Sequence, residues 1–541
     1  MLTPSKETRA SAAPSDATTN PRKPKLRVVA VSAPECIEGN KARAALNSPD
    51  PVSLFNACRC AANAALRGCG AWGQSNWVEP DKALRQKFLL MYSLDDMPLF
   101  TKLLKTEHPN LVLIGTMTLC MPGAIECAKV VRSVLGNKTL IVLGGRHVNE
   151  TIFLTDESQR FTSSVRHHTA SPGRLIREGK IPPLFDLIIS GEAELPIMRI
   201  GELLIQAEQE RIRYIAKNLD RQIAGRWIID FPSLDKTVVS VGTAIKHDEL
   251  PSVVKTFGIS ASFRVFHDRM TSHVFSDTGP GCVYDCEFCS ERRSVAGNIQ
   301  EIKSAAWRLY NQLEDTVNTV EHYYPGKKAS AFVEDSILLS GSANALKQLC
   351  QLLERKPLDI VFGAQFTLDQ IINKSSIIQR LAQNGLTYIF IGLETLEPIE
   401  IGGLSKDVGS KHGTWRNRFT QVISILTDNN ISCGCALLFG LGEAHASRKK
   451  LLKGLTLMKK RSGQPIAISA NWAVRHPLKG ENESNKEDFL RWGTPAGELL
   501  ECFHNFGEAS LEYPLPNIGP PTLGEVKEIL NLLKAFEVSH A

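Results

Sequence analysis

The sequence lacks a long apolar run, a dense block of basic residues and a regular cysteine framework. No apolar stretch approaches about 18 residues, so we expect no membrane span. The net charge of +6 is spread over 541 residues, which does not favour a nucleic-acid partner. The thirteen cysteines form no small disulfide framework, and the chain does not open on an apolar secretory segment. These absences favour a protein of the reducing cytoplasm.

The length and local composition suggest several domains. Residues 1–25 are rich in Ser, Thr, Pro and Ala, and we expect them to be disordered. A first domain is expected over 26–225 and a linker over 226–265, which carries the Pro- and Asp-containing run Ile228–Asp235. A second domain is expected over 266–480 and a small helical extension over 481–541.

Four apolar stretches in the first domain read as strands separated by helix-length segments. Continuous apolar strands that alternate with helices predict a parallel sheet covered on both faces. Ligands bind such sheets at the carboxyl ends of the strands, where Thr116, Gly144, Gly145 and Glu192 fall. The four predicted strands are Leu26–Ser32, Leu111–Gly115, Leu140–Gly145 and Asp186–Gly191.

The second domain reads as six strand–helix units. Apolar residues recur every three or four positions between Ile302 and Tyr324, which predicts a helix packed on a core. Six parallel strands predict a partial barrel, with its chemistry at the C-terminal strand ends. The predicted strands are His273–Ser276, Ala329–Val333, Leu358–Gln365, Thr387–Gly392, Ser432–Leu438 and Ile466–Ala473.

Cys282, Cys286 and Cys289 stand at the spacing C-x3-C-x2-C just after the first of these six strands. A 4Fe–4S cubane usually takes four thiolates, so three would leave one iron open to another molecule. The alternative is a structural zinc site, which needs a fourth Cys or His nearby. His273 lies nine residues upstream, and the next cysteine is Cys350.

The cysteine motif and its context resemble the radical S-adenosylmethionine superfamily. Phe288 precedes the third cysteine, where that family carries an aromatic that packs on adenine. Gly279-Pro-Gly-Cys leads into the motif in place of the family's usual Arg-Gly-Cys. The resemblance implies a 4Fe–4S cluster on the three cysteines, S-adenosylmethionine on the open iron, and an electron donor such as flavodoxin or ferredoxin.

Residues after the later strands fit the same resemblance. It implies that Glu334 and Asp335 lie near the amino group of S-adenosylmethionine and that Glu394, in Gly-Leu-Glu-Thr, contacts it. Gly440 and Gly442 would admit the adenosine. For each acid the alternative is a solvated side chain or a helix cap.

The stretch from Leu111 to Ile205 resembles the flavodoxin-like, cobalamin-binding domain that precedes many of these barrels. Leu-Gly-Gly-Arg-His ends at His147, and Asp-Leu-Ile-Ile-Ser-Gly-Glu-Ala-Glu ends at Glu194. The resemblance implies cobalamin at Thr116, Gly144, Gly145 and Glu192. The Asp-x-His-x-x-Gly motif is absent, so a scaffold without cobalamin stays an alternative. We expect His147 to be structural or solvent-facing rather than an axial ligand.

Two further groups of cysteines invite metal or thiol chemistry. Cys433 and Cys435 are two apart on a predicted strand and share one face. They would line the cavity if that face is the barrel interior, and otherwise they are small buried hydrophobes. Cys58, Cys60 and Cys69 would suit a second cluster, as in methylthiotransferases. Those enzymes also carry a C-terminal RNA-binding barrel, whereas 481–541 shows helices and turns.

The function expected from the resemblance is cleavage of S-adenosylmethionine to modify a small molecule, by cobalamin-dependent methyl transfer or by radical rearrangement. One alternative is transfer of the 3-amino-3-carboxypropyl group to a thiol or metalloid acceptor. Another is a non-catalytic iron–sulfur or cobalamin sensor, for which the sequence shows no recognition helix or basic segment. The substrate and the bond that breaks stay open at this point.

Overall fold

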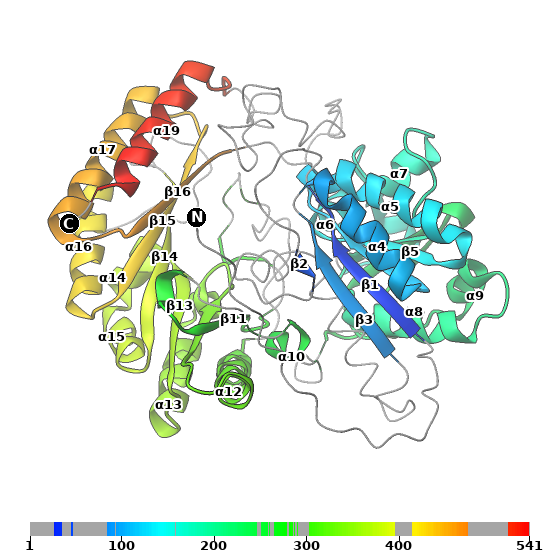
Figure 1. The fold of residues 1–541 in the computed structure, drawn as a ribbon, viewed down its shortest axis with the longest axis horizontal. Coiled ribbons are helices and arrows are strands. Elements are labelled where there is room, and N and C mark those ends of the chain that lie inside the picture. The colour runs from blue at the N-terminus through cyan, green and yellow to red at the C-terminus, as the bar shows by residue number, and fades with distance from the viewer. Residues whose placement is uncertain are drawn as a thin grey trace, which may run out of the picture.

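The computed structural model forms two α/β lobes (Figure 1). It describes residues 26–34, 45–46, 84–91, 93–156, 158–245, 250, 252–257, 259, 264–278, 281–284, 286, 289, 302–394, 414–473 and 518–539. Phe288 and the group Cys58, Cys60 and Cys69 lie outside these residues, as do residues 1–25 and most of 481–541. In the part that is described, no helix combines the length and the apolar character needed to cross a membrane.

The first lobe is an eight-stranded sheet in the order β10-β9-β8-β5-β4-β1-β3-β2. Five neighbouring strands of this sheet, β8, β5, β4, β1 and β3, run parallel to one another. Numbered along the chain, these five strands have the order 2-1-3-4-5 of flavodoxin-like folds. The bounds are β1 Leu26–Ser32, β2 Ala45–Leu46, β3 Leu84–Leu90, β4 Leu111–Gly115, β5 Leu140–Gly144, β8 Leu187–Gly191, β9 Trp227–Phe231 and β10 Lys236–Val239.

Helices cover both faces of this sheet because its central strands are apolar on both sides. Alternate residues of β4 enter two separate cores: Val112 and Ile114 pack with α4 and α5, and Leu111 and Leu113 pack with α8 and α9. The flavodoxin-like domain predicted from the apolar strands is therefore confirmed. The helices are α4 Met97–Glu107, α5 Met121–Leu135, α6 Arg146–Thr151, α7 Pro172–Arg177, α8 Glu194–Gln206 and α9 Arg211–Asn218.

Two strands of this sheet fall within the residues that the sequence assigns to the linker. β9 and β10 add an antiparallel hairpin beside β8. Asp230 of β9 is fully buried and accepts hydrogen bonds from Arg177 of α7 and from Thr237. Arg177 lies in the polar segment 155–183, which also contains β7 Val165–His167, the antiparallel partner of the preceding short strand β6 Ile152–Leu154. The contact between buried Asp230 and distant Arg177 thus stabilises a hairpin that local composition does not predict.

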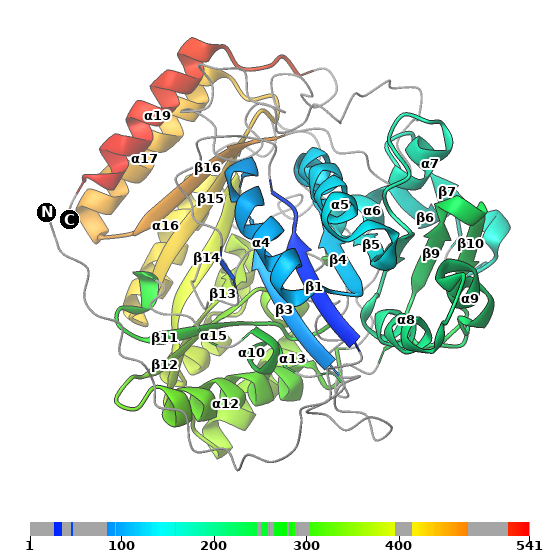
Figure 2. The ribbon, with the colours of Figure 1, turned by 45° about the vertical axis from the view of Figure 1, so that its right-hand side comes forward.

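The second lobe is a six-stranded sheet in chain order, β11 to β16, with every neighbouring pair parallel. Figure 2 shows this sheet curling into a half-barrel with helices on its outer side. The predicted partial barrel of six strands is confirmed. Its strands are β11 Met270–Val274, β12 Ala329–Val333, β13 Ile360–Phe366, β14 Leu386–Glu394, β15 Ser432–Phe439 and β16 Ala467–Trp472. Its helices are α10 Val253–Phe257, α12 Ala305–Tyr323, α13 Ala343–Arg355, α14 Leu368–Asn373, α15 Ser375–Gln383, α16 Trp415–Asp428, α17 His445–Ser462 and α19 Leu523–Glu537.

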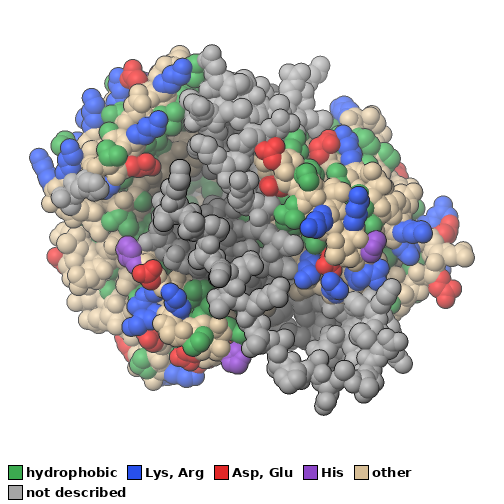
Figure 3. All heavy atoms as spheres, in the orientation of Figure 1, with side chains coloured by type: hydrophobic (Ala, Val, Ile, Leu, Met, Phe, Trp, Pro, Cys, Tyr) green, Lys and Arg blue, Asp and Glu red, His purple; other side chains and the backbone are tan. Residues whose placement is uncertain are grey.

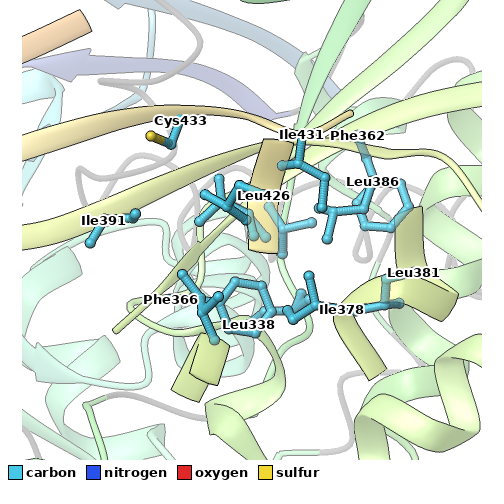
Figure 4. Close-up of a cluster of buried hydrophobic side chains, with 14 of the residues drawn as sticks. Leu338, Phe362, Phe366, Ile378, Leu381, Leu386, Ile391, Leu426, Ile431 and Cys433 are labelled. Atoms are coloured by element: carbon cyan, nitrogen blue, oxygen red, sulfur yellow. The ribbon is translucent and has the colours of Figure 1, made fainter. Parts of the chain in front are cut away.

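Cys433 and Cys435 of β15 lie on the face of the half-barrel sheet that the outer helices cover. Both thiols are fully buried in the apolar core between the strands and the outer helices, and Figure 4 draws Cys433 in one cluster with Leu426 and Ile391. Gly434 faces the other way, where an added Cβ would lie 2.2 Å from the Tyr388 hydroxyl. Of the two alternatives that the sequence leaves open, the second holds: the two thiols are small core hydrophobes and do not line the barrel interior.

Replacing Cys433 and Cys435 by alanine tests this placement. Each change should lower the free energy of unfolding by about 1–2 kcal/mol, because it removes a buried sulfur without emptying a large volume. Any iron that the parent protein binds should be retained in full by both variants, since neither thiol faces the interior. A loss of iron with little loss of stability, measured by iron assay and thermal melting, would contradict the placement.

Candidate active site

The loop that carries Cys282, Cys286 and Cys289, here called the cysteine loop, follows β11. It packs against residues that follow β15 and β16, at the opposite end of the strand order. Cys286 is 5% exposed and shares an apolar cluster with Leu441, which follows β15, and Ala473, which follows β16. Cys282 and Cys289 are half-buried, and the Cys289 amide donates to the Cys286 carbonyl at 3.0 Å. The loop therefore lies at the C-terminal strand ends, where the barrel architecture places chemistry.

The donor set of this loop fits a cluster better than a single ion. Within the described part of the chain, no three His, Cys, Asp or Glu side chains gather closely enough to hold one metal ion. His273, the nearest fourth ligand for zinc, instead has its Nδ1 2.5 Å from Oε1 of Glu334. In a cubane each thiolate binds a different iron, so the three sulfurs stand farther apart than the ligands of one ion. Three free cysteines on one loop, two of them half-buried and one buried, offer such a set of thiolates.

Asp335 holds the segment that leads from β11 into the cysteine loop. The amide of Ser276 donates to Oδ1 at 2.9 Å, and the hydroxyl of Ser276 donates to Oδ2. The Leu339 amide also donates to Oδ2, at 3.0 Å. Burial raises the pKa of this carboxyl group to about 6, against the three donors that favour its ionised form.

Two side chains of α12 hold the same segment from the opposite side. Arg308 donates to the carbonyl oxygens of Ser276 at 3.3 Å and Asp277 at 2.9 Å, and Gln312 donates to that of Phe275 at 2.5 Å. Arg308 and Gln312 are each about 95% buried, although both are polar. Asp277 adopts a φ of 52°, a left-handed conformation that the surrounding bonds hold in place. We call Asp335, Arg308 and Gln312 the loop clamp.

The loop clamp was not predicted, but the sequence carries a signal for it. Arg308 and Gln312 are four residues apart, within the apolar stripe that predicts the buried face of α12. Polar residues at such positions need buried partners. The backbone groups of residues 275–277 are those partners, which only the folded chain reveals.

Glu334 and Asp335 both make contacts within the protein at the end of β12. Glu334 pairs with His273 on the inner face, and Asp335 belongs to the loop clamp. Their predicted contact with S-adenosylmethionine stays a prediction. Glu394 is 8% exposed and has a φ of 53°, at a point where the pairing of β14 with β15 shifts register. Held left-handed conformations at non-glycine residues cluster at ligand sites, so Glu394 remains a candidate contact.

The turn after β15 is built around two glycines and a buried ion pair. Gly440 and Gly442 have φ values of 79° and 105°, which L side chains rarely adopt. The carboxylate of Glu443 accepts the amides of Gly440 and Leu441, each at 2.9 Å, and pairs with Arg448. The sequence pointed only to the glycines of this turn, and the roles of Glu443 and Arg448 appear in the folded chain.

Arg448 also joins this turn to the last strand. Its guanidinium carbon lies 5.5 Å from the centre of the Trp472 ring, within cation–π distance. Trp472 in turn packs edge-on against Phe439, with ring centres 5.4 Å apart. The ends of β15 and β16 are thereby fixed where Leu441 and Ala473 meet the cysteine loop.

The residues predicted to face cobalamin lie at the carboxyl edge of the first sheet, but their contacts are with the backbone. A Cβ on Gly145 would lie 2.4 Å from the Thr116 carbonyl oxygen, and the Thr116 amide donates to Gly144. The Glu192 carboxylate accepts the Arg226 amide at 2.7 Å, and burial raises its pKa. The glycine at 145 is therefore required by the fold itself, and a cofactor at this edge stays a prediction.

His147 is structural, as expected. It is fully buried, with Nδ1 3.1 Å from the Thr118 hydroxyl and Nε2 3.0 Å from the Ala170 carbonyl oxygen. Both ring nitrogens are thus engaged within the domain. This arrangement does not suit an axial metal ligand.

Three solved structures resemble the chain as a whole. One is OxsB, a cobalamin-dependent S-adenosylmethionine radical enzyme with aqua-cobalamin bound, at 14% identity and a TM-score of 0.47. The match covers 80% of this chain and 52% of OxsB, so the chain spans about half the length of that protein. The others are two structures of the radical S-adenosylmethionine methyltransferase TsrM from Kitasatospora setae. One has tryptophan and aza-SAM bound (12% identity, TM-score 0.45, covering 83% and 73%), and one has cobalamin and a [4Fe-4S] cluster (13%, 0.47, covering 82% and 72%).

Neither a scan of protein-family models nor a search of curated proteins gave a match. The identities and TM-scores of the solved structures are too low to assign this chain to a family or to give it an activity. Its function therefore has to be inferred from its own residues.

Asp335→Asn should remove a pH dependence of stability that the parent protein has. The folded-state pKa of Asp335 is raised from 3.8 to about 6, so the folded chain binds the proton more tightly than the unfolded chain. Its contribution to stability therefore falls as the pH rises from about 4 to about 6 and is level above that, by on the order of 1–3 kcal/mol. The melting temperature of the asparagine variant relative to the parent should rise over this window. A difference that does not change between about pH 4.5 and about pH 7.5 would contradict the assignment.

Proposed function

We propose that this chain is a radical S-adenosylmethionine enzyme that holds a 4Fe–4S cluster on Cys282, Cys286 and Cys289. We further propose that it modifies a small molecule by cobalamin-dependent methyl transfer. One observation carries the proposal: three thiols lie on the loop after the first strand of a parallel half-barrel, packed against a glycine turn at the strand ends. Three thiolates without a fourth leave an iron open to a ligand.

The residues around the loop have distinct proposed roles. When bound, the cluster would supply the electron that breaks a carbon–sulfur bond of S-adenosylmethionine. Gly440 and Gly442 keep the turn beside the loop free of side chains, which leaves room for an adenosine. Glu394 offers a carboxylate near the strand ends for an amino or hydroxyl group. Leu438 and Leu441 line the apolar cluster with Cys286 and limit the access of water to the cysteines.

A second cofactor is proposed at the edge of the first sheet. In the strand order 2-1-3-4-5 the connections diverge between β1 and β4, and ligands of such sheets bind beside that point. Thr116 follows β4 there, and Gly144 lies at the end of the adjacent β5. Cobalamin bound at this edge would be the source of the methyl group.

The alternative of aminocarboxypropyl transfer to a soft acceptor loses its structural support. A cavity lined by cysteines would suit a soft acceptor, but Cys433 and Cys435 lie in the outer core. A cytoplasmic location and a protein electron donor remain part of the proposal.

Analysis of the products of S-adenosylmethionine tests the proposal. Anaerobically reconstituted protein should form 5′-deoxyadenosine under reducing conditions. With added cobalamin it should also form S-adenosylhomocysteine, which S-adenosylmethionine leaves when it gives up its methyl group. Cys286→Ala should lose both products, while Cys433→Ala, a matched thiol outside the site, should retain them. Methylthioadenosine alone would point to aminocarboxypropyl transfer. No product from a protein with full iron content would refute the proposal.

Glu443→Gln tests the role of the glycine turn. The amide has one acceptor oxygen for the two backbone donors and no charge for Arg448, and charge-assisted hydrogen bonds contribute about 1.5–3 kcal/mol. We expect the affinity for S-adenosylmethionine to fall by about tenfold or more, measured by equilibrium binding. Glu528→Gln, which weakens exposed pairs with Lys449 and His445, is the control and should bind normally. Equal affinity for S-adenosylmethionine in both variants would show that the glycine turn does not contribute to binding it.

A further inference from the structure

A groove of about 390 Å³ runs between α16 and α17 on the outer wall of the half-barrel. Its lining includes Arg416 from the start of α16 and three lysines of α17, Lys449, Lys450 and Lys453. Leu457 also lines the groove and is 55% exposed. Figure 3 shows Lys and Arg side chains gathered along the side of the molecule where α17 and α19 lie.

Among the described residues, only one of the four cations that line this groove, Lys449, has an acidic partner. Helix α17 carries Lys and Arg but no Asp or Glu. On its other side α19 supplies two acids, Glu525 near Arg448 and Glu528 paired with Lys449. Among the described residues, Arg416, Lys450 and Lys453 form no ion pair. The helix is thus neutralised towards α19 and left cationic towards α16.

The groove belongs to the same strand–helix unit that braces the cysteine loop. Helix α16 leads into β15 and α17 follows it, and the turn between β15 and α17 contacts Cys286 through Leu441. Arg448 of α17 holds that turn through Glu443. A protein docked on the outer side of α17 would therefore sit behind the helix whose inner side fixes the loop.

We propose that this groove docks the acidic protein that donates electrons to the cluster, an inference that rests on the proposed function. One electron would leave the reduced flavin or iron–sulfur centre of the donor and lower the charge of the cluster by one unit, with no bond made or broken. Complementary charge would steer the donor to this face, and Leu457 would give the contact an apolar anchor. Four cations around one short groove are too few for the continuous basic stripe of a nucleic-acid site.

Charge reversal at the groove tests the proposal by binding and by turnover. The variant is Lys450→Glu with Lys453→Glu, and the control is Lys102→Glu with Lys217→Glu, two exposed lysines of the first lobe. Both variants change the net charge equally. The affinity of the reconstituted protein for a bacterial flavodoxin should fall by tenfold or more in the groove variant only, and the parent's affinity should weaken with salt.

Turnover separates docking from chemistry. Cleavage of S-adenosylmethionine driven by flavodoxin should fall in the groove variant, whereas cleavage driven by dithionite should be equal in all three proteins. Equal flavodoxin affinity in the groove variant and the control would overturn the docking site. It would also be overturned if the groove variant lost binding to a single-stranded RNA while its flavodoxin affinity was unchanged. If dithionite drives no cleavage in the parent, the proposed function fails, and flavodoxin binding still decides whether the groove docks an acidic protein.

Discussion

The loop clamp is the interaction on which the geometry of the site depends. It joins three elements that are far apart in sequence: the end of β11, helix α12 and the turn after β12. Its donors and acceptors are backbone groups and largely buried side chains, and an unmade bond there would cost about 1–3 kcal/mol. The chain therefore leaves β11 in one direction only, towards the ends of β15 and β16, where Cys286 meets Leu441.

A second set of buried polar contacts fixes the surface that receives the loop. Glu443 shapes the glycine turn, Arg448 pairs with Glu443, and Trp472 lies under the guanidinium. The loop clamp fixes the start of the cysteine loop, and the Glu443 contacts fix the turn that carries Leu441. Together they hold both sides of the contact between Cys286 and Leu441. Both are ionic or charge-assisted and both are buried, so each would be costly to break and neither depends on the apolar core alone. This division leaves the outer helices to fill the core, including the positions of Cys433 and Cys435.

The apolar pattern of the sequence predicts most of the fold, because each buried strand announces itself locally. Strands β1, β4 and β12 begin and end where their apolar runs predict. The hairpin β9–β10 falls within the predicted linker, because the sequence does not show that Asp230 is buried beside Arg177, which is distant in the chain. The face of β15 that holds its thiols was equally undetermined, since period-two alternation gives two equivalent faces and only the packed helices distinguish them. In the site, the three cysteines and the glycines were visible as motifs. Arg308 and Gln312 instead act through contacts with residues distant in sequence, and Arg448 of the local Glu443 pair does so through Trp472.

The most direct test of this account is the spectroscopy of the reconstituted cluster with and without S-adenosylmethionine. The account predicts about four irons per chain, held by Cys282, Cys286 and Cys289, and one iron available to an added ligand. The electron paramagnetic resonance spectrum of the reduced cluster should therefore change when S-adenosylmethionine is added. A stoichiometric zinc ion in place of iron, or a fully loaded cluster whose spectrum is unaffected by S-adenosylmethionine, would contradict it.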